Sequence, residues 1–346
     1  MPSADLDAAF DPDAFDPDHC ESIYWVFTQR CNDECDHCYN LSGPHGETMS
    51  LEDCLVVVEN LPTRLDRLIL SGGEPLTERK KLYAILEAVQ DRYGDDTQVM
   101  LQTNGDLLTG KRLDEVLARG VTRIDLASID RYHQHQGERL DELRALFLSR
   151  GMRDDNTAPL IEKDTYLKRD APSFGYWGAT EDMWLGGNWA RGRAVKTRNW
   201  LRDGTHNFCA VLSGARGFLG GTDLPQEISI QLWRVNPCCP GTREPMGDAR
   251  TERVADVLAR VAESPVFQAL NRGDAYGMGE SLGIPQAEGL ERAIERGNVC
   301  LWCDEFFGHH FDAAALGPRT EPADTMVPSH ILPVLSGAPD GGRGGA

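Results

Sequence analysis

The sequence lacks an apolar run of the 18 or so residues that a membrane-spanning helix needs. It also lacks a basic start, because the first 29 residues contain no Lys or Arg and six of the first 18 are Asp, so no secretory signal peptide is expected. Basic residues are outnumbered throughout, with 35 Lys and Arg against 55 Asp and Glu and a net charge of −20. Phosphate backbones bind basic surfaces. We therefore expect a cytoplasmic protein whose partners are neither a membrane nor a nucleic-acid polymer.

Cysteine, by contrast, is plentiful, with ten in 346 residues. In a chain expected to be intracellular, so many cysteines indicate metal or redox chemistry rather than a disulfide scaffold. Hydrophobic residues make up 40% and charged residues 26%, which is typical of a globular protein. The length predicts about two domains, or one large α/β domain with an appendage.

Strand and helix patterns alternate through the first half of the chain. Strands are expected at 22–28, 67–70, 98–103 and 122–128, and helices at 51–61, 79–92, 111–119 and 139–149. Repeated strand-then-helix units imply a parallel sheet, whose functional residues gather at the carboxyl ends of its strands. The second half is less regular, with a hairpin expected near 215–219 and 227–235 and helices at 250–261 and 288–296.

Three cysteines follow the first expected strand in the pattern Cys-x3-Cys-x2-Cys, at Cys31, Cys35 and Cys38. Three thiolates can bind three irons of a 4Fe–4S cluster and leave the fourth iron open for chemistry. The spacing alone leaves a zinc knuckle as an alternative. Ser71-Gly72-Gly73-Glu74-Pro75 ends the second strand, and Leu101-Gln102-Thr103-Asn104-Gly105 ends the third. Paired glycines allow a close backbone approach, and the Glu74 carboxylate suits an ammonium group.

These three motifs, in this order and each at a strand end, resemble the radical S-adenosylmethionine (radical SAM) enzymes over roughly residues 22–150. The resemblance implies an α/β fold, a partial (β/α)6 TIM-like barrel of parallel strands with a small C-terminal twitch-like hairpin and helix extension. It implies that Cys31, Cys35 and Cys38 bind a 4Fe–4S cluster, to which S-adenosylmethionine binds. The cofactor-binding residues it implies are His37, Gly72, Gly73, Glu74, Thr103, Asn104, Ser128, Asp130 and Arg193.

Two of these assignments have a plain structural alternative. His37 precedes the third cysteine, where an aromatic residue near the adenine is usual in the family, and it could equally be a packing residue. Arg193 belongs to Gly192-Arg193-Ala194, which in relatives lies near the cofactor carboxylate, and it could equally be part of a solvated arginine cluster. The motifs identify no catalytic side chain.

The second half contains a further group of cysteines that resembles the twitch extension, which binds one auxiliary iron–sulfur cluster. The expected ligands are Cys209, Cys238, Cys300 and Cys303, with Cys239 as the alternative to Cys238. Zinc or buried free thiols are the alternative explanations. The expected organisation is an acidic lead-in at 1–20, the partial barrel at 21–207, the extension at 208–316 and a disordered tail at 317–346, which contains eleven Gly or Pro.

The substrate is expected to be a small sugar or nucleoside carboxylate. Trp177, Trp184, Trp189 and Trp200 fall among arginines, and indole faces stack on rings while arginine binds carboxylates, although core packing is the alternative for each. The Cys31, Cys35 and Cys38 placement and Ser-Ile-Asp-Arg-Tyr-His at 128–133 resemble decarboxylases of nucleoside antibiotic biosynthesis. A sugar or aminocyclitol dehydrogenase or epimerase, a peptide-modifying maturase and a non-catalytic metal-binding scaffold stay open. An external one-electron reductant of the flavodoxin or ferredoxin type is implied.

Overall fold

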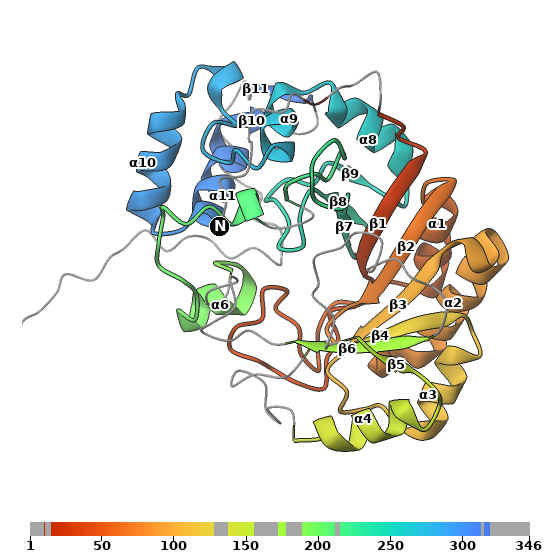
Figure 1. Ribbon diagram of the computed structural model, residues 1–346. Helices are drawn as coiled ribbons and strands as arrows, with labels where there is room; N and C mark the ends of the chain where they lie inside the picture. Colours follow the sequence, from red (N-terminus) through yellow and green to blue (C-terminus); the bar gives the residue numbers. More distant parts are fainter. Residues whose placement is uncertain are drawn as a thin grey trace, which may run out of the picture.

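A nine-stranded sheet with the order β5-β6-β4-β3-β2-β1-β7-β8-β9 forms the centre of the molecule (Figure 1). This computed structural model describes residues 10, 15–127, 138–155, 172–177, 189–211, 215–312 and 315–318. The strands of the sheet are β1 (His19–Val26), β2 (Arg64–Ser71), β3 (Gln98–Thr103), β4 (Val121–Ala127), β5 (Arg153–Asp154), β6 (Ser173–Trp177), β7 (Ile228–Gln231), β8 (Arg234–Asn236) and β9 (Gly247–Asp248). A separate small sheet pairs β10 (Phe311–Asp312) with β11 (Gly317–Pro318).

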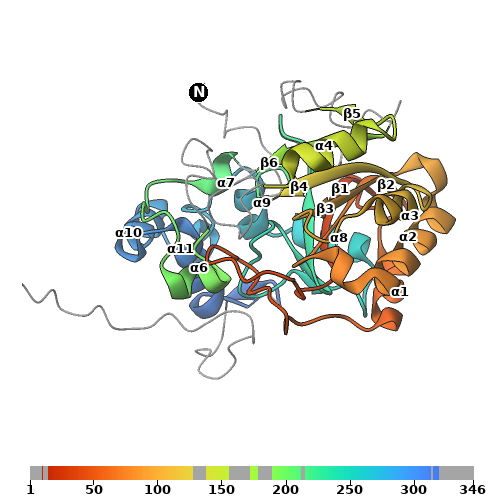
Figure 2. The ribbon, with the colours of Figure 1, turned by 90° about the horizontal axis from the view of Figure 1, so that it is seen from below.

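The helices are α1 (Leu51–Asn60), α2 (Arg79–Tyr93), α3 (Gly110–Leu117), α4 (Leu140–Leu148), α6 (Gly192–Thr197), α7 (Phe208–Val211), α8 (Val254–Ala262), α9 (Pro265–Asn271), α10 (Gln286–Arg296) and α11 (Val299–His309). Short 3-10 turns occupy Pro75–Glu78, Gly94–Asp96 and Glu280–Leu282. Figures 1 and 2 place α1–α3 along one side of the sheet and α6, α10 and α11 beyond the other. Within the described ranges, no helix is both long enough and apolar enough to cross a bilayer.

The strand pairing confirms the predicted α/β architecture. β1, β2, β3, β4 and β6 pair in parallel, β5 joins β6 in parallel, and β7 adds in parallel to the free edge of β1. β8 and β9 then continue the sheet antiparallel. Over the described residues the sheet stays open, as expected of a partial barrel. The carboxyl ends of the parallel strands therefore lie at one edge, where the three sequence motifs meet.

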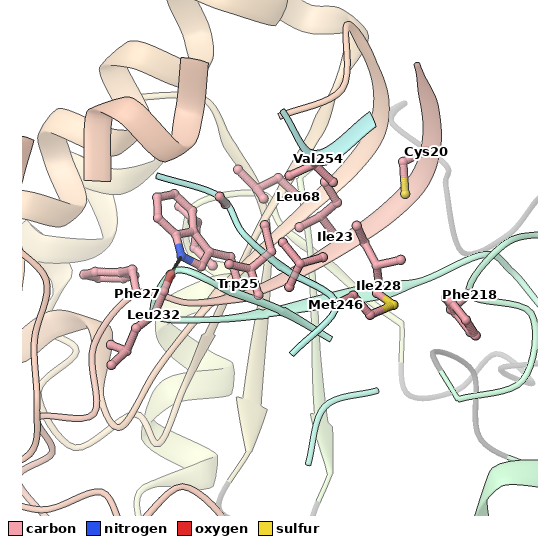
Figure 3. Close-up of a cluster of buried hydrophobic side chains, with 14 of the residues drawn as sticks. Cys20, Ile23, Trp25, Phe27, Leu68, Phe218, Ile228, Leu232, Met246 and Val254 are labelled. Atoms are coloured by element: carbon pink, nitrogen blue, oxygen red, sulfur yellow. Dashed lines mark hydrogen bonds between the residues drawn. The ribbon is translucent and has the colours of Figure 1, made fainter. Parts of the chain in front are cut away.

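Successive side chains of β1 point alternately to the two faces of the sheet. Ile23 and Trp25 belong to the main apolar core with residues of α1 and α2, whereas Tyr24 and Val26 form a small cluster on the opposite face with Ile69 and Met100. Figure 3 shows part of the main core, including the hydrogen bond of 2.8 Å from Trp25 Nε1 to the Leu232 carbonyl oxygen. We call the face with Tyr24 the inner face.

Buried charges also line the inner face, and they are paired. Arg67 is 1% exposed; its Nη2 lies 3.2 Å from Glu227 Oε2, and the Ser22 hydroxyl donates to the same oxygen at 3.0 Å. Arg123 pairs with Asp125 at 3.0 Å. Unpaired buried charges would cost several kcal/mol each. Pairing therefore allows the inner face to be polar without being open to bulk water.

The predicted elements of the first half are confirmed to within a few residues, and Ser50 caps α1 by accepting a hydrogen bond from the Asp53 amide. The predicted hairpin is wrong in its first strand. Residues 215–219 form turns and a bend with one bridge position at Arg216, and the real hairpin, β7 and β8, lies almost entirely inside the single strand predicted at 227–235. Its reversal at Leu232 has a φ of 57°, which non-glycine residues seldom adopt, so no turn signal marks it. α9 and β6 were not predicted.

Candidate functional site

The loop that contains the first three cysteines begins directly after β1 and folds back on itself. Isolated bridges join Thr28 to Thr48 and Arg30 to Gly43, and the Cys31 amide donates to the Gly43 carbonyl at 2.9 Å. Cys31 is buried, and Cys35 and Cys38 are half-buried. The sequence therefore positions all three thiols in one compact loop at the carboxyl edge of the sheet.

The three thiols lie in a setting that suits metal-bound sulfur. The Ser42 amide donates to Cys38 Sγ at 3.3 Å, and the Asn104 amide group lies 4.0 Å from Cys31 Sγ as a donor. Donors aimed at sulfur stabilise cluster thiolates and tune their potential. Burial, followed by neighbouring carboxylates and thiols, raises the pKa of Cys31 to about 12 and that of Cys35 further. Iron binding at this loop must therefore release the thiol protons.

The donor set at this loop consists of three thiols. Three thiolates can bind three irons of a 4Fe–4S cluster and leave the fourth iron open, so the residues present fit such a cluster. Within the described residues, no group of three His, Cys, Asp or Glu side chains is arranged as the ligands of a single metal ion are.

Gly72 and Gly73 make their close approach to the cysteine loop itself. The Gly73 amide donates to the Thr28 carbonyl at 2.7 Å, and the Glu74 amide donates to the Arg30 carbonyl at 2.8 Å. A Cβ at Gly73 would lie 2.4 Å from the Arg30 oxygen, and one at Gly72 would lie 2.6 Å from the Thr28 oxygen. The glycines thus let the end of β2 pair with the backbone that leads into the cluster loop.

The Glu74 carboxylate is wholly buried and accepts hydrogen bonds from the protein. The Thr103 hydroxyl lies 2.9 and 2.8 Å from its two oxygens, and the Leu76 and Asn104 amides donate to it at 2.9 and 2.8 Å. Burial raises the pKa of Glu74 to about 7, because these neutral donors only partly offset the loss of water. In this structure Glu74 connects the ends of β2 and β3, a role that the sequence did not indicate.

Asn104 connects the third strand to the cysteine loop. Its side-chain amide donates to Asn32 Oδ1 at 3.1 Å, in addition to its contact with Cys31 Sγ. The ends of β1, β2 and β3 are therefore joined directly, as the motif order predicted. Ser128 and Asp130, the other residues predicted for the ribose side, lie outside the described residues.

Gly192 and Arg193 hold the cysteine loop from the side of α6. The Arg193 amide donates to the Cys38 carbonyl at 2.8 Å, and its guanidinium donates to the carbonyls of Cys35 at 3.0 Å and Ser42 at 2.6 Å. Gly192 has a φ of 56°, and a Cβ there would lie 2.3 Å from the Tyr39 oxygen. Arg193, predicted near a cofactor carboxylate, is thus bound to the loop backbone. His37 lies half-buried in the same loop.

An aromatic group that the sequence analysis missed lies beside the loop. The hydroxyls of Tyr24 and Tyr39 share a hydrogen bond of 3.1 Å, and Tyr24 also bonds Ser71 at 2.8 Å. Trp189 meets the Tyr39 ring edge-on at 5.0 Å between centroids. Trp189 Nε1 is buried and finds no acceptor among the described residues. The alternation of β1 could have revealed Tyr24, because it stands opposite the apolar Ile23 and Trp25.

The four cysteines predicted in the second half come from three separate segments. Cys209 lies in α7, Cys238 follows β8, and Cys300 and Cys303 lie on the first turns of α11. Burial raises the pKa of Cys209 well above its usual value, and the thiols of Cys300, Cys238 and Cys303 raise it further, in that order. The four thiols therefore lie near one another, with Cys300 and Cys303 buried and Cys209 and Cys238 half-buried.

Cys239 points elsewhere. It packs against the inner-face cluster of Tyr24, Val26, Ile69 and Met100, and its Sγ lies 4.0 Å from Glu227 Oε1. Its own carbonyl accepts a hydrogen bond of 2.6 Å from Gln231. Of the two adjacent thiols, Cys238 therefore faces the other three cysteines and Cys239 faces the inner side of the sheet.

Comparison with known proteins supports the superfamily predicted from the motifs. Residues 25–130 match the family model of the Radical SAM superfamily. The chain is 40% identical over 113 residues to the AdoMet-dependent heme synthase of Methanosarcina barkeri, covering 31% of this chain and 30% of that protein. It is 33% identical over 112 residues to the pre-heme d1 synthase of Dinoroseobacter shibae, covering 31% and 26%. The chain thus spans less than a third of the length of these curated relatives.

Two solved structures also resemble the chain. The crystal structure of BtrN in complex with AdoMet and 2-DOIA has a TM-score of 0.47 and 16% identity, covering 74% of this chain and 89% of that one. Polyhistidine-tagged anSMEcpe with bound AdoMet has a TM-score of 0.41 and 14% identity, covering 68% and 79%. Neither similarity is high enough to transfer a reaction or a substrate.

Proposed function

We propose that this chain is a radical SAM enzyme in which Cys31, Cys35 and Cys38 bind a 4Fe–4S cluster. The observation that supports this most directly is the compact three-thiol loop at the carboxyl edge of the sheet, joined backbone to backbone with Gly73 and Glu74. When bound, the cluster and S-adenosylmethionine supply a 5′-deoxyadenosyl radical that removes a hydrogen atom from the substrate. The protein contributes binding, orientation and exclusion of water.

Some residues around the loop fix its position, and others are proposed to contact the cofactor. Arg193 fixes the loop through three hydrogen bonds to its backbone, and Glu74 fixes the ends of β2 and β3. Gly72, Gly73, Thr103 and Asn104 present backbone and short polar groups at this edge, where S-adenosylmethionine would bind. His37 would lie beside the adenine, and Ser128 and Asp130 would contact the ribose, as the family resemblance implies.

For the substrate, we propose the glucuronate of cytosylglucuronic acid, which would lose carbon dioxide. The sequence resembles the cytosylglucuronate decarboxylase of blasticidin S biosynthesis in its length, its first three cysteines and the stretch at 128–133. Tyr39 and Trp189 add support, because half-buried aromatic faces suit a sugar or a pyrimidine. The buried indole N–H of Trp189 is a donor for a ligand oxygen.

We further propose that Cys209, Cys238, Cys300 and Cys303 bind an auxiliary 4Fe–4S cluster. Four thiols from three segments, two of them buried and two half-buried, support this, because the thiols of Cys300, Cys238 and Cys303 are close enough to raise the pKa of Cys209. Four thiolate ligands leave no open iron, so the auxiliary cluster would pass electrons and not bind S-adenosylmethionine. An external flavodoxin- or ferredoxin-type reductant would supply them.

The test is an anaerobic assay of reconstituted protein with dithionite, S-adenosylmethionine and cytosylglucuronic acid. We expect 5′-deoxyadenosine and carbon dioxide together, and neither from the Cys31→Ala, Cys35→Ala, Cys38→Ala triple variant. Cys54→Ala is the matched control, because Cys54 is buried in α1 away from both cysteine groups. A ketone or an inverted centre without carbon dioxide would replace the decarboxylase with a dehydrogenase or epimerase. Unchanged 5′-deoxyadenosine in the triple variant would refute the radical SAM site.

A further inference from the structure

A buried guanidinium lies among the four cysteines of the second group. Arg191 immediately precedes α6 and is 4% exposed. Its Nη1 donates to the Cys300 carbonyl at 2.7 Å and lies 3.0 Å from Asp304 Oδ2. The same nitrogen donates to the Ala190 carbonyl at 3.1 Å, and Nε donates to the Gly241 carbonyl at 3.4 Å. One side chain thus connects three segments of the chain.

Two of those segments supply three of the cysteines. Gly241 closes the turn after β8, since its amide donates to the Cys238 carbonyl at 3.0 Å. Cys300, Cys303 and Asp304 lie together at the start of α11, where Asn298 caps the helix by accepting from the Cys300 amide at 2.8 Å. Arg191 therefore sets the distance between the Cys238 turn and the Cys300–Cys303 turn through the several hydrogen bonds of its planar guanidinium.

The guanidinium of Arg191 lies against the backbone that carries the cysteines. It donates to the Cys300 carbonyl and to the carbonyl of Gly241, which closes the turn after Cys238. Because Arg191 is 4% exposed, its charge is only weakly screened by water and salt. Arg243 lies farther along α11, where its guanidinium would meet a Cβ added at Gly308.

We propose that Arg191 is the positioning residue and counter-charge of the auxiliary cluster and sets its reduction potential. This inference rests on the proposed function of Cys209, Cys238, Cys300 and Cys303 as ligands. A cluster bound by four thiolates is negatively charged, and each added electron makes it more so. In a buried site this charge requires a nearby cation, because no water compensates it. Arg191 therefore favours the reduced cluster, and Asp304, which contacts the same guanidinium, opposes it.

The experiment uses the full chain with Cys31, Cys35 and Cys38 replaced by Ala, so that only the auxiliary cluster is observed. Iron content and an EPR-monitored redox titration are measured for this parent and with Arg191→Gln, Arg191→Lys or Asp304→Asn added. We expect Arg191→Gln to lower the midpoint potential by at least the 59 mV that corresponds to a tenfold change for one electron. Arg191→Lys keeps the charge and should restore most of that shift.

Asp304→Asn gives the decisive comparison, because it should raise the potential, opposite to Arg191→Gln. A merely structural Arg191 would give shifts of the same sign in both variants, or none, and either result would overturn the inference. Arg216→Gln removes another buried arginine, one paired with Asp223, and should leave the potential unchanged. If Arg191→Gln loses its iron, Asp304→Asn decides: a potential above that of the parent supports the counter-charge, and an unchanged or lower potential overturns it. Arg191→Lys should stay near the potential of the parent. A parent that binds no iron would refute the auxiliary cluster itself, an outcome distinct from a loaded cluster with an unmoved potential.

Discussion

Replacing Gly192 by Ala would test whether α6 must touch the first cysteine loop. Gly192 has a left-handed φ of 56°, and an added Cβ would lie 2.3 Å from the Tyr39 oxygen and 2.7 Å from the Cys38 oxygen. These are backbone atoms of the loop, so no side chain can turn aside to make room. Either α6 moves away or the Cys38–Tyr39 backbone does, and Arg193 loses its amide bond of 2.8 Å to the Cys38 carbonyl.

The expected loss in the free energy of unfolding has two parts. A non-glycine residue in the left-handed region costs about 1–2 kcal/mol. Inserting a methyl group into packed surroundings that must shift costs about 1–3 kcal/mol more. We therefore expect Gly192→Ala to lower the free energy of unfolding by about 2–5 kcal/mol. Gly283→Ala is the matched control, because Gly283 has a φ of 82° with nothing within 4 Å of the added Cβ. It should cost about 1–2 kcal/mol, from the backbone strain alone.

Urea unfolding followed by circular dichroism measures the loss of stability in both variants. Iron content after anaerobic reconstitution measures how well the cysteine loop binds iron. Gly192→Ala should retain less iron at Cys31, Cys35 and Cys38 than Gly283→Ala does. Equal stability and equal iron content in the two variants would refute the argument, because the contact with the Tyr39 carbonyl would then not hold the loop in place.

Two further predictions concern buried carboxyl and thiol groups. Burial raises the folded-state pKa of Glu74 from 4.5 to about 7, so the stability it contributes is full below pH 4.5 and is lost as the pH rises through 7. At 1.36 kcal/mol per unit, iron-free wild type should lose about 3 kcal/mol more than Glu74→Gln between pH 4.5 and pH 8 in urea titrations, and parallel curves would contradict this. Cys238→Ala should reduce bound iron from about eight to about four per chain, whereas the adjacent Cys239→Ala should keep about eight. Loss of iron from Cys239→Ala would show that the ligand assignment is wrong.

Local sequence patterns predicted most of the first half. β3 was predicted with its observed bounds, because its apolar run ends at a Thr-Asn-Gly turn. α1 was predicted because Ser50 can cap it, and the structure shows that hydrogen bond at 3.0 Å. The strand predicted at 215–219 was wrong because the buried apolar residues of this segment, such as Phe218, lie in turns. Those turns are fixed by the Asn271 side chain, which accepts from Leu219 and donates to Gly220 across some fifty residues. Such long-range bonds leave no local signal.

The motifs identified residues at the candidate site but not what each side chain contacts. Glu74 and Arg193 were both predicted as contacts of the cofactor, Glu74 from its carboxylate and the family resemblance, and Arg193 from the resemblance alone. The structure adds contacts within the chain: the Thr103 hydroxyl and the Asn104 amide donate to Glu74, and Arg193 donates to carbonyls of the cysteine loop. Spacing along the chain does not reveal these contacts, because their partners lie on separate segments.

The pair Cys238–Cys239 illustrates the same limit and how the fold resolves it. The register of the sheet puts Asn236 on the inner face, because Asn236 pairs with Ser229, which stands beside Tyr24 of β1. Strict alternation beyond Asn236 would turn Cys238 to the inner face and Cys239 away from it. The chain instead leaves the strand after Asn236 and forms a bend and a turn, in which the Gly241 amide donates to the Cys238 carbonyl at 3.0 Å. Cys239 consequently packs against the inner-face cluster. The ligand choice therefore depends on this turn, which the strand pattern of the sequence does not reveal.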